Sequence, residues 1–129
     1  MEYRLHRDTG EKKPTRYFSK KQEDAVAKSV GGRTTPNSGA TPVYKGDITT
    51  DNFIIECKTS TTDKKSFTLH KEWFDKNRDE SIFMKKEHSA VVVSFGPNSE
   101  NYYIINENDF LIMKQLLELY ESGQINIDL

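Results

Sequence analysis

One short segment constrains the fold of this chain more than any other: the sequence AVVVSF at residues 90–95. It is almost wholly apolar and rich in β-branched residues, which favours a strand. Because the segment has no alternating polar positions, neither face of such a strand suits water, and both must be covered. At 129 residues the chain is long enough for one modest core. The segment therefore predicts the central strand of a single sheet with helices on both faces.

Three more strands are expected beside it. Residues 47–50 and 53–58 are apolar segments separated by Asp51-Asn52, which predicts a hairpin with a tight turn. Residues 102–105 follow a turn signal at residues 97–99 and predict another strand. These strands give a sheet in which the hairpin and residues 90–95 lie close to one another.

Helical spacing is expected in three other segments. Ser19 and Gln22 fit a capping box, so the first helix is expected over residues 19–30, with Gly31 ending it. The last is expected to begin at Asn106 or Asn108 and to stop at Gly123. The middle helix lies within residues 69–86, and its expected apolar anchors are Leu69, Trp73, Phe74, Ile82 and Phe83.

The order helix, hairpin, helix, strand, strand, helix predicts an α/β fold with a mixed central sheet of about four to five strands flanked by helices. Residues 1–18 are expected to form a basic N-terminal extension, and residues 19–129 a single domain. The loop at residues 33–46 is rich in Pro, Gly, Ser and Thr, and its length favours a functional role over simple connection.

Composition excludes several classes of protein. Mean hydropathy is -0.79 and 30% of residues are charged, while no apolar run approaches the roughly 20 residues of a membrane helix. The N-terminus lacks the apolar core of a signal peptide. One cysteine excludes an intramolecular disulfide and a multi-cysteine zinc site. We therefore expect a soluble protein of a reducing compartment, the cytoplasm, with no membrane partner.

The net charge of -1 conceals an uneven distribution. Residues 1–33 carry nine Lys/Arg against five Asp/Glu, whereas residues 87–129 carry one against seven. A near-neutral total does not exclude a polyanionic partner, because local charge decides where such a partner binds. The basic third is either an electrostatic footprint for nucleic acid or a solvated arm.

The chemistry-bearing residues gather at the hairpin. Residues i and i+2 of a strand share a face, so Glu56 and Lys58 are expected to point together while Cys57 points toward a core. Asp47 begins the partner strand and is expected to lie across from them. Two carboxylates and a backbone carbonyl such as that of Cys57 suit Mg²⁺, which keeps several waters and takes substrate phosphate. Lys58 would then orient or deprotonate a water, or neutralise charge on a phosphate.

The motif of an acidic residue two positions before a lysine is weak evidence in so charged a chain, because most examples are exposed ion pairs. The context of Glu56 and Lys58 separates them from the others: an apolar strand precedes them, a carboxylate lies one hairpin away, and Glu23 lies on the helix before.

With Asp47 followed by Glu56-x-Lys58 on the next strand, the chain resembles the PD-(D/E)XK nuclease superfamily, and within it the small Holliday-junction resolvases of archaeal type and their phage-encoded relatives. The resemblance covers roughly residues 19–110. It implies a restriction-endonuclease-like fold, with Asp47, Glu56 and the Cys57 carbonyl holding Mg²⁺ (Mn²⁺ substituting) and Lys58 as the catalytic lysine. The family's helix acid maps to Glu23, with Asp24 the neighbouring possibility, and its loop serine to Ser38.

Two departures from the family accompany this resemblance: Gly46 stands where proline commonly precedes the first metal carboxylate, and some eighteen residues precede the first helix. The implied activity is hydrolysis of phosphodiester bonds in branched DNA by a homodimer with two sites. Tyr102, Tyr103 and residues 116–120 are apolar enough to pack a dimer interface or a core.

Basic residues near the candidate site are expected to contact DNA phosphates. They are Arg16, Lys20, Lys21, Arg33, Lys64, Lys65 and Lys71. The first four, in or beside the first helix and at the start of the loop, form the better electrostatic footprint as a group, whereas each of the three lysines after the hairpin is equally consistent with a solvated surface. Two other functions remain open: a DNA-binding or assembly module with a nuclease fold and no turnover, and a general or restriction-like nuclease.

Overall fold

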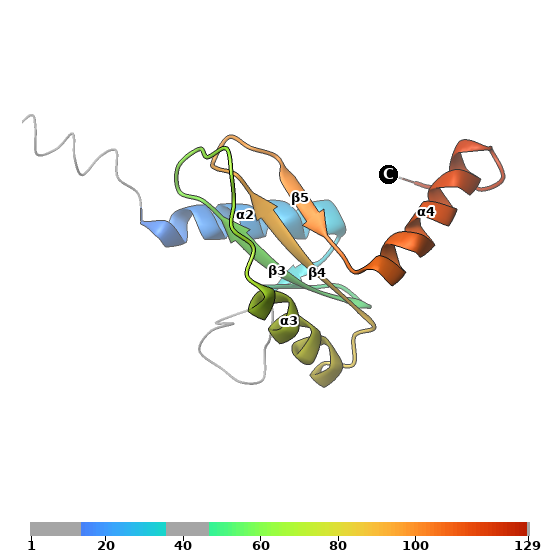
Figure 1. Ribbon diagram of the computed structural model, residues 1–129, viewed down its shortest axis with the longest axis horizontal. Coiled ribbons are helices and arrows are strands. Elements are labelled where there is room, and N and C mark those ends of the chain that lie inside the picture. The colour runs from blue at the N-terminus through green and yellow to red at the C-terminus, as the bar shows by residue number, and fades with distance from the viewer. Residues whose placement is uncertain (1–13, 36–46, 129) are drawn as a thin grey trace, which may run out of the picture.

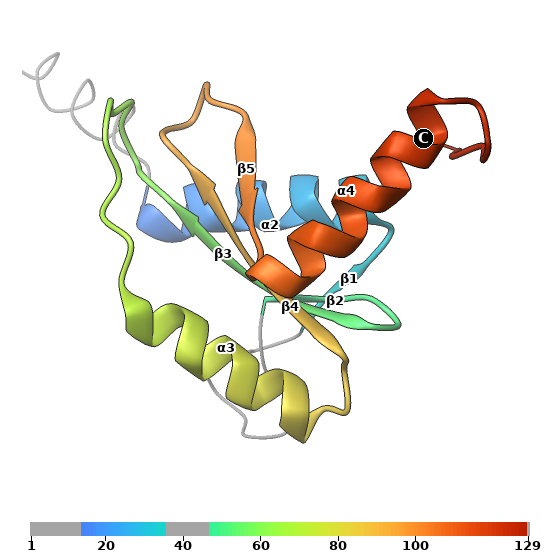
Figure 2. The same ribbon diagram turned by 45° about the vertical axis from the view of Figure 1, so that its right-hand side comes forward.

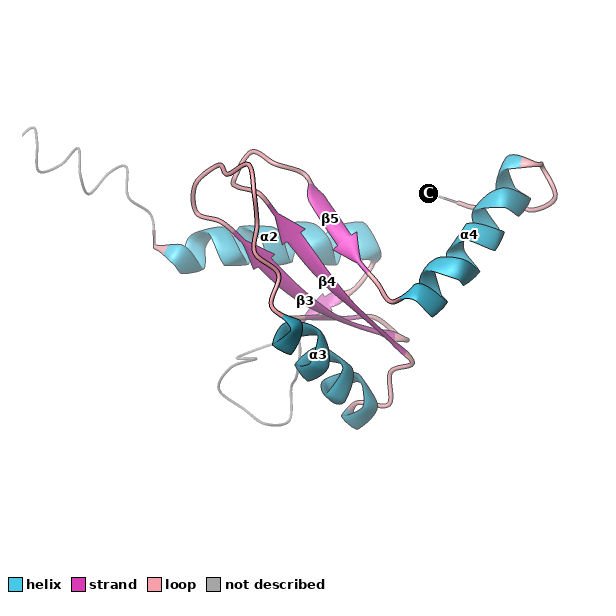
Figure 3. Ribbon diagram, viewed as in Figure 1, coloured by secondary structure: helices cyan, strands magenta, loops and turns pink. Residues whose placement is uncertain are grey.

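The computed structural model describes residues 14–35 and 47–128, which form a sheet with helices on its two faces (Figures 1 and 3). The helices are α2 (Thr15–Val30), α3 (Lys71–Phe83) and α4 (Glu107–Glu121). The strands, in their spatial order, are β1 (Arg33–Thr34), β2 (Ile48–Thr49), β3 (Phe53–Thr59), β4 (His88–Ser94) and β5 (Asn101–Ile104). The expected α/β fold with a mixed central sheet is confirmed.

The sheet is mixed because one of its four pairings is parallel. β3 and β4 run parallel, joined by a crossover through α3, whereas the β1–β2, β2–β3 and β4–β5 pairs are antiparallel. The expected hairpin is present: Ile48 pairs with Ile55, and the Thr50 N–H donates to the Phe53 carbonyl across the turn. The two-residue strand β1 was not expected, because its Arg33-Thr34 carries no apolar signal.

The first helix begins earlier than its sequence suggested. α2 starts at Thr15 with Pro14 as N-cap, and no side chain caps it, so the capping box expected at Ser19 is wrong. Proline is tolerated at a helix start because its missing N–H would have no partner there, and nothing between Pro14 and Ser19 interrupts the helix. Residues 15–18 thus belong to the helix. Its end is as expected, since Gly31 adopts a left-handed φ of 68°.

The apolar core lies between α2 and one face of the sheet. Val26 is fully buried and packs with Ile48, Ile55, Ala90 and Val92. Residues 90–94 of β4 are each at most 4% exposed, which confirms a central strand covered on both faces.

The opposite face is covered by α3 (Figure 2), and a buried polar side chain of α3 bonds the sheet there. Asn77 is 2% exposed, and its side-chain amide donates to the Ala90 carbonyl at 2.9 Å. Leu69, Ile82 and Phe83, expected as apolar anchors, are 48–67% exposed, so that expectation is wrong. Helical spacing of apolar residues was a poor guide here because the buried positions of α3 are Asn77, Glu80 and Ser81.

The last helix, α4, begins at Asn106, whose side chain accepts from the Asp109 N–H at 2.8 Å, and ends just before Gly123. Asp109 is its one buried residue, and its outer turns stand clear of the sheet (Figures 1 and 2). None of the helices in the described ranges has the length and apolarity required to cross a bilayer.

We expect Val26→Ala to lower the free energy of unfolding by about 2 kcal/mol, because it removes buried methyl groups and leaves a cavity facing Ile55 and Val92. Ser29→Ala, at an exposed position of the same helix, is the control. Urea denaturation followed by circular dichroism measures both changes. Equal midpoints for the two variants would contradict this account of the core.

Candidate active site

The site is built on an edge of β3 that β2 is too short to cover. β2 pairs with β3 only at Ile54 and Ile55, and the Asp47 N–H adds a bond to the Ile55 carbonyl at 3.0 Å. Beyond that point, one oxygen of the Asp47 carboxylate accepts from the Cys57 N–H at 2.8 Å. In the described part of the chain, a side chain therefore takes the place of a neighbouring strand. A carboxylate is held directly beside the backbone of Cys57.

Glu56 and Lys58 lie together on the α3 face of β3, as their spacing predicted. The Lys58 ammonium is 3.3 Å from a Glu56 carboxylate oxygen, and their side chains are 31% and 17% exposed. Such a pair is neither a solvated surface bridge nor a sealed core pair. Both groups are held by the fold and still reach solvent.

The backbone of Cys57 contributes to the same edge. In a strand, the N–H and C=O of one residue point to the same side, so the Cys57 carbonyl points toward the edge where Asp47 lies. Its side chain lies on the α2 face of the sheet and packs against the core there. The residue can thus offer a carbonyl oxygen at the edge while its thiol lies among core residues.

Glu23 approaches this edge from α2, on the other face of the sheet. Burial raises the pKa of Glu23 to about 7, and the nearby Asp47 and Glu56 carboxylates add to the rise, while Arg16 and Lys20 oppose it. The acid expected on the first helix is therefore close enough to interact electrostatically with both hairpin carboxylates. Asp24, the alternative, is exposed and pairs with Lys20 at 3.6 Å.

The other titratable groups report the same concentration of negative charge. Burial and then the Asp47 charge raise the pKa of Glu56, with Lys58 opposing them. Burial also raises the pKa of the Cys57 thiol, and Asp47, Glu23 and Glu56 each raise it further. Three carboxylates thus act on one thiol, with Lys58 the cation that offsets them there. The three carboxylates therefore repel one another, while Lys58 contacts Glu56 directly and Arg16, Lys20 and Lys76 act on them electrostatically.

An aromatic ring contacts the Lys58 ammonium. The Lys58 ammonium lies 4.8 Å from the centroid of the Trp73 ring, a distance at which a cation is attracted by the π-face. His70 and Phe67 contact the same indole, at ring separations of 4.8 and 6.3 Å. Sequence reasoning assigned Trp73 to the core and missed this contact. No local pattern signals a contact between residues 15 positions apart on different elements.

Gln22 ties the Lys58 end of β3 to α2. Its side-chain amide donates to the Lys58 carbonyl at 2.9 Å and to the Asn101 side chain at 3.2 Å, and the residue is 7% exposed. A buried amide that bonds backbone fixes the position of the strand that carries Glu56 and Lys58. Sequence reasoning missed this role because a glutamine on a charged helix looks like a surface residue.

The predicted DNA-contacting residues lie in three places. Arg16, Lys20 and Lys21 are exposed on the first half of α2, and Arg16 and Lys20 are near enough to act on Glu23. Arg33 lies beyond the far end of α2, on β1. The remaining lysines, Lys64, Lys65 and Lys71, are exposed along the link from β3 to α3, with Lys71 paired to Asp75 at 2.8 Å. Ser38 and Gly46 lie outside the described residues.

The donor set suits Mg²⁺, which keeps several waters, better than it suits a metal ion bound entirely by protein side chains. Among the residues that the structure describes, no three His, Cys, Asp or Glu side chains form a metal site by themselves. What the edge offers is Asp47, Glu56 and a backbone carbonyl, with Glu23 near. Mg²⁺ takes one or two carboxylates and completes its shell with water and phosphate. Such a cation would lower the repulsion among these carboxylates.

No family model, no curated protein and no solved structure matches the chain at a significant level. The resemblance to nucleases therefore depends on the residues and geometry of this chain alone.

In the presence of EDTA, we expect the stability of the protein relative to Glu23→Gln to fall as pH rises from about 4.5 through about 7. The folded protein holds the Glu23 proton more tightly than the unfolded chain, because the folded pKa is about 7 against an ordinary value of 4.5. Protonation of Glu23 therefore stabilises the folded protein at pH values below the unfolded pKa, and this stabilisation is lost as the pH rises above the folded pKa.

Urea denaturation at a series of pH values measures this difference, with Asp24→Asn at the neighbouring exposed position as the control. Parallel stability curves for the protein and Glu23→Gln would show that folding does not raise the pKa of Glu23.

Proposed function

We propose that this protein is a Mg²⁺-dependent DNA endonuclease that hydrolyses phosphodiester bonds, with branched DNA such as a Holliday junction as its substrate. One observation carries the proposal: Asp47, Glu56 and Lys58 converge at a solvent-accessible edge of β3, with Glu23 close to the two hairpin acids. A structural ion pair would need only Glu56 and Lys58. The two further acids, Asp47 and Glu23, are partly buried, raise the electrostatic cost of the site and have no role in such a pair.

In this proposal Asp47, Glu56 and the Cys57 carbonyl hold the divalent ion, and Glu23 supports it directly or through water. When bound, the ion neutralises charge on the scissile phosphate and lowers the pKa of water. Lys58 is held by Glu56 and the Trp73 ring, so its ammonium is positioned to donate to a phosphate oxygen or to orient the attacking water. In the hydrolysis, water forms one P–O bond and the bond to the departing nucleoside oxygen breaks.

DNA binding is assigned to exposed basic residues of two segments. Arg16 and Lys20 lie near Glu23, and Lys64 and Lys65 follow β3 on the loop to α3, beside the end of β4. Cations in contact with the phosphate backbone would offset the repulsion between the acids and the substrate. Branched rather than linear substrate is proposed from the resemblance to junction resolvases.

We expect Lys58→Ala and Asp47→Asn each to reduce cleavage by about 100-fold or more, because each removes a charged group that acts on the phosphate or its cation. Both variants should still bind DNA, since the exposed basic residues are unchanged. The measurement is nicking of a labelled four-way junction with Mg²⁺ and with EDTA, beside gel-shift binding of the same junction in Ca²⁺.

The matched controls are Lys114→Ala on α4 and Asp51→Asn at the tip of the hairpin, both exposed and outside the site. They should cut at the rate of the parent protein. Junction binding without Mg²⁺-dependent nicking by the parent would indicate a non-catalytic module instead. Equal nicking of linear duplex and junction would indicate a general nuclease, and undiminished cutting by both site variants would refute the assignment.

A further inference from the structure

A continuous series of aromatic rings lies beside Lys58, on the face of the sheet that carries α3. Between centroids, the ring of Phe95 is 5.7 Å from that of Tyr102 and 6.1 Å from that of Phe67. Phe67 in turn contacts Trp73, and Trp73 contacts His70. Each separation lies within the range of attractive ring pairs. These five rings therefore form one surface, called here the aromatic surface.

The two ends of the aromatic surface are open to solvent. Tyr102 is 48% exposed on β5, and His70 is exposed just before the start of α3. The three rings between them are partly buried, so they hold the two outer rings in place from below the surface. Contiguous rings with exposed ends form a rigid apolar platform, and exposed apolar surface of this kind marks an interaction site.

The register of the sheet places this platform next to the candidate active site. Lys58 pairs with Val93 and Val93 pairs with Tyr102, so the three side chains share one face of β3, β4 and β5. The Lys58 ammonium also lies 4.8 Å from the centroid of the Trp73 ring. α3 bonds the sheet at the Ala90 carbonyl, nearer the start of β4. A nucleic acid strand whose phosphate reached Lys58 would therefore have the aromatic surface directly beside it.

Exposed lysines accompany the rings on the segment between β3 and α3. Lys64 lies beside Phe95, because its N–H donates to the Phe95 carbonyl at 2.7 Å. Lys71 follows His70 directly and pairs with Asp75, and both lysines are exposed. Cations interleaved with aromatic rings are typical of surfaces that bind single-stranded nucleic acid, where the cations meet phosphates and the rings take bases.

Unpaired nucleotides are the ligands that such a surface can hold. In a duplex each base is stacked between its neighbours, so a side-chain ring reaches a base face only where the strand is single or has opened. Every base has a π-face, so stacking on rings requires no particular base sequence. The aromatic surface therefore favours a single strand over a duplex.

We propose that the aromatic surface binds unpaired nucleotides of a DNA strand, whose bases stack on Tyr102 and His70 next to the phosphate that Lys58 meets. The substrate is then DNA in which the strand is unpaired beside the cut bond, as at an open branch point. This inference rests on the proposed nuclease function and identifies the part of the substrate that lies beside the site.

Trp73 reports binding, because it is the one tryptophan of the chain and belongs to the aromatic surface. The full chain is titrated in EDTA with labelled oligothymidine and with an abasic oligonucleotide of the same length, and anisotropy gives the two affinities. Oligothymidine should bind about fivefold tighter or more and quench the Trp73 fluorescence, since the abasic strand keeps the phosphates and lacks the bases. Equal affinities, or tighter binding without a change at Trp73, would overturn the proposal.

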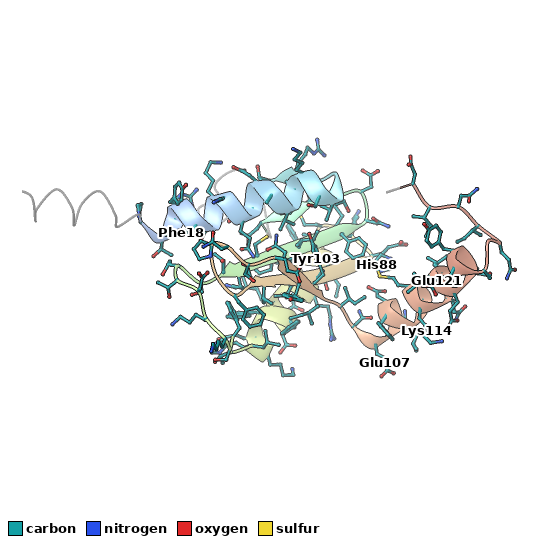
Figure 4. The ribbon with its side chains drawn as sticks, turned by 90° about the horizontal axis from the view of Figure 1, so that it is seen from above. Phe18, His88, Tyr103, Glu107, Lys114 and Glu121 are labelled. Atoms are coloured by element: carbon teal, nitrogen blue, oxygen red, sulfur yellow. The ribbon has the colours of Figure 1, made fainter. Side chains whose placement is uncertain are left out.

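Tyr102 and Tyr103 supply a matched pair of variants. Tyr103 is the next residue of β5 (Figure 4), is 43% exposed, and pairs with Val92, which packs under α2 on the other face. Tyr102→Ala should weaken oligothymidine binding by about fivefold or more, whereas Tyr103→Ala and the ring-preserving Tyr102→Phe should bind as the parent does. His70→Ala should weaken binding from the other end of the surface. Far-UV circular dichroism checks that each variant is folded.

Binding and cutting are measured separately, so the two proposals can fail separately. Base-dependent binding at Trp73 by a protein that cuts no DNA in Mg²⁺ would refute the nuclease and retain the stacking site. Cutting that Lys58→Ala abolishes, with oligothymidine binding undiminished in Tyr102→Ala and His70→Ala, would overturn the stacking site and retain the nuclease. Equal losses in Tyr102→Ala and Tyr103→Ala would also overturn it, because the loss would not depend on the face that carries Lys58.

Discussion

The structure depends on a strand that stops early. Because β2 has only two residues, the outer edge of β3 lacks a ladder partner in the described chain just where Glu56 and Lys58 begin. The Asp47 carboxylate fills that position by accepting the Cys57 N–H. An unpaired strand edge usually requires protection, and here an acid provides it. The same hydrogen bond that protects the edge therefore places a carboxylate beside the Glu56–Lys58 pair.

Holding these acids close together is electrostatically unfavourable, and several elements of the fold contribute to holding them. Glu23, Asp47 and Glu56 come from a helix, a loop end and a strand, so no local change of conformation separates them. Burial and mutual repulsion raise the pKa of Glu23 and Glu56. Trp73 and Gln22 hold the strand and its lysine in place from opposite faces. Groups with strongly shifted pKa values held together in this way are typical of functional sites.

Much of this organisation could be read from the sequence, because it depends on local patterns. The apolar run at residues 90–95, the turn at Asp51-Asn52 and the two-residue spacing of Glu56 and Lys58 each determine geometry within a few residues. The face that α3 buries could not be read from the sequence. Asn77 is buried because it bonds the Ala90 carbonyl, a contact across 13 residues that no periodicity signals. The start of α2 was misplaced for a simpler reason: a capping signal at Ser19 outweighed Pro14. That α4 stands apart follows from tertiary packing alone.

The side chain of Cys57 gives this edge an internal reporter. A thiol reacts through its thiolate, and three neighbouring carboxylates together with burial suppress that form. The chain has no other cysteine, so its native sulfur should be chemically quiet toward alkylating agents while the acids are charged. A cation bound among the acids would reduce the electrostatic part of that suppression, while burial, its largest cause, would remain. A change in the alkylation rate of this one sulfur when a cation is added would therefore report positive charge at the edge of β3, on a background that burial sets.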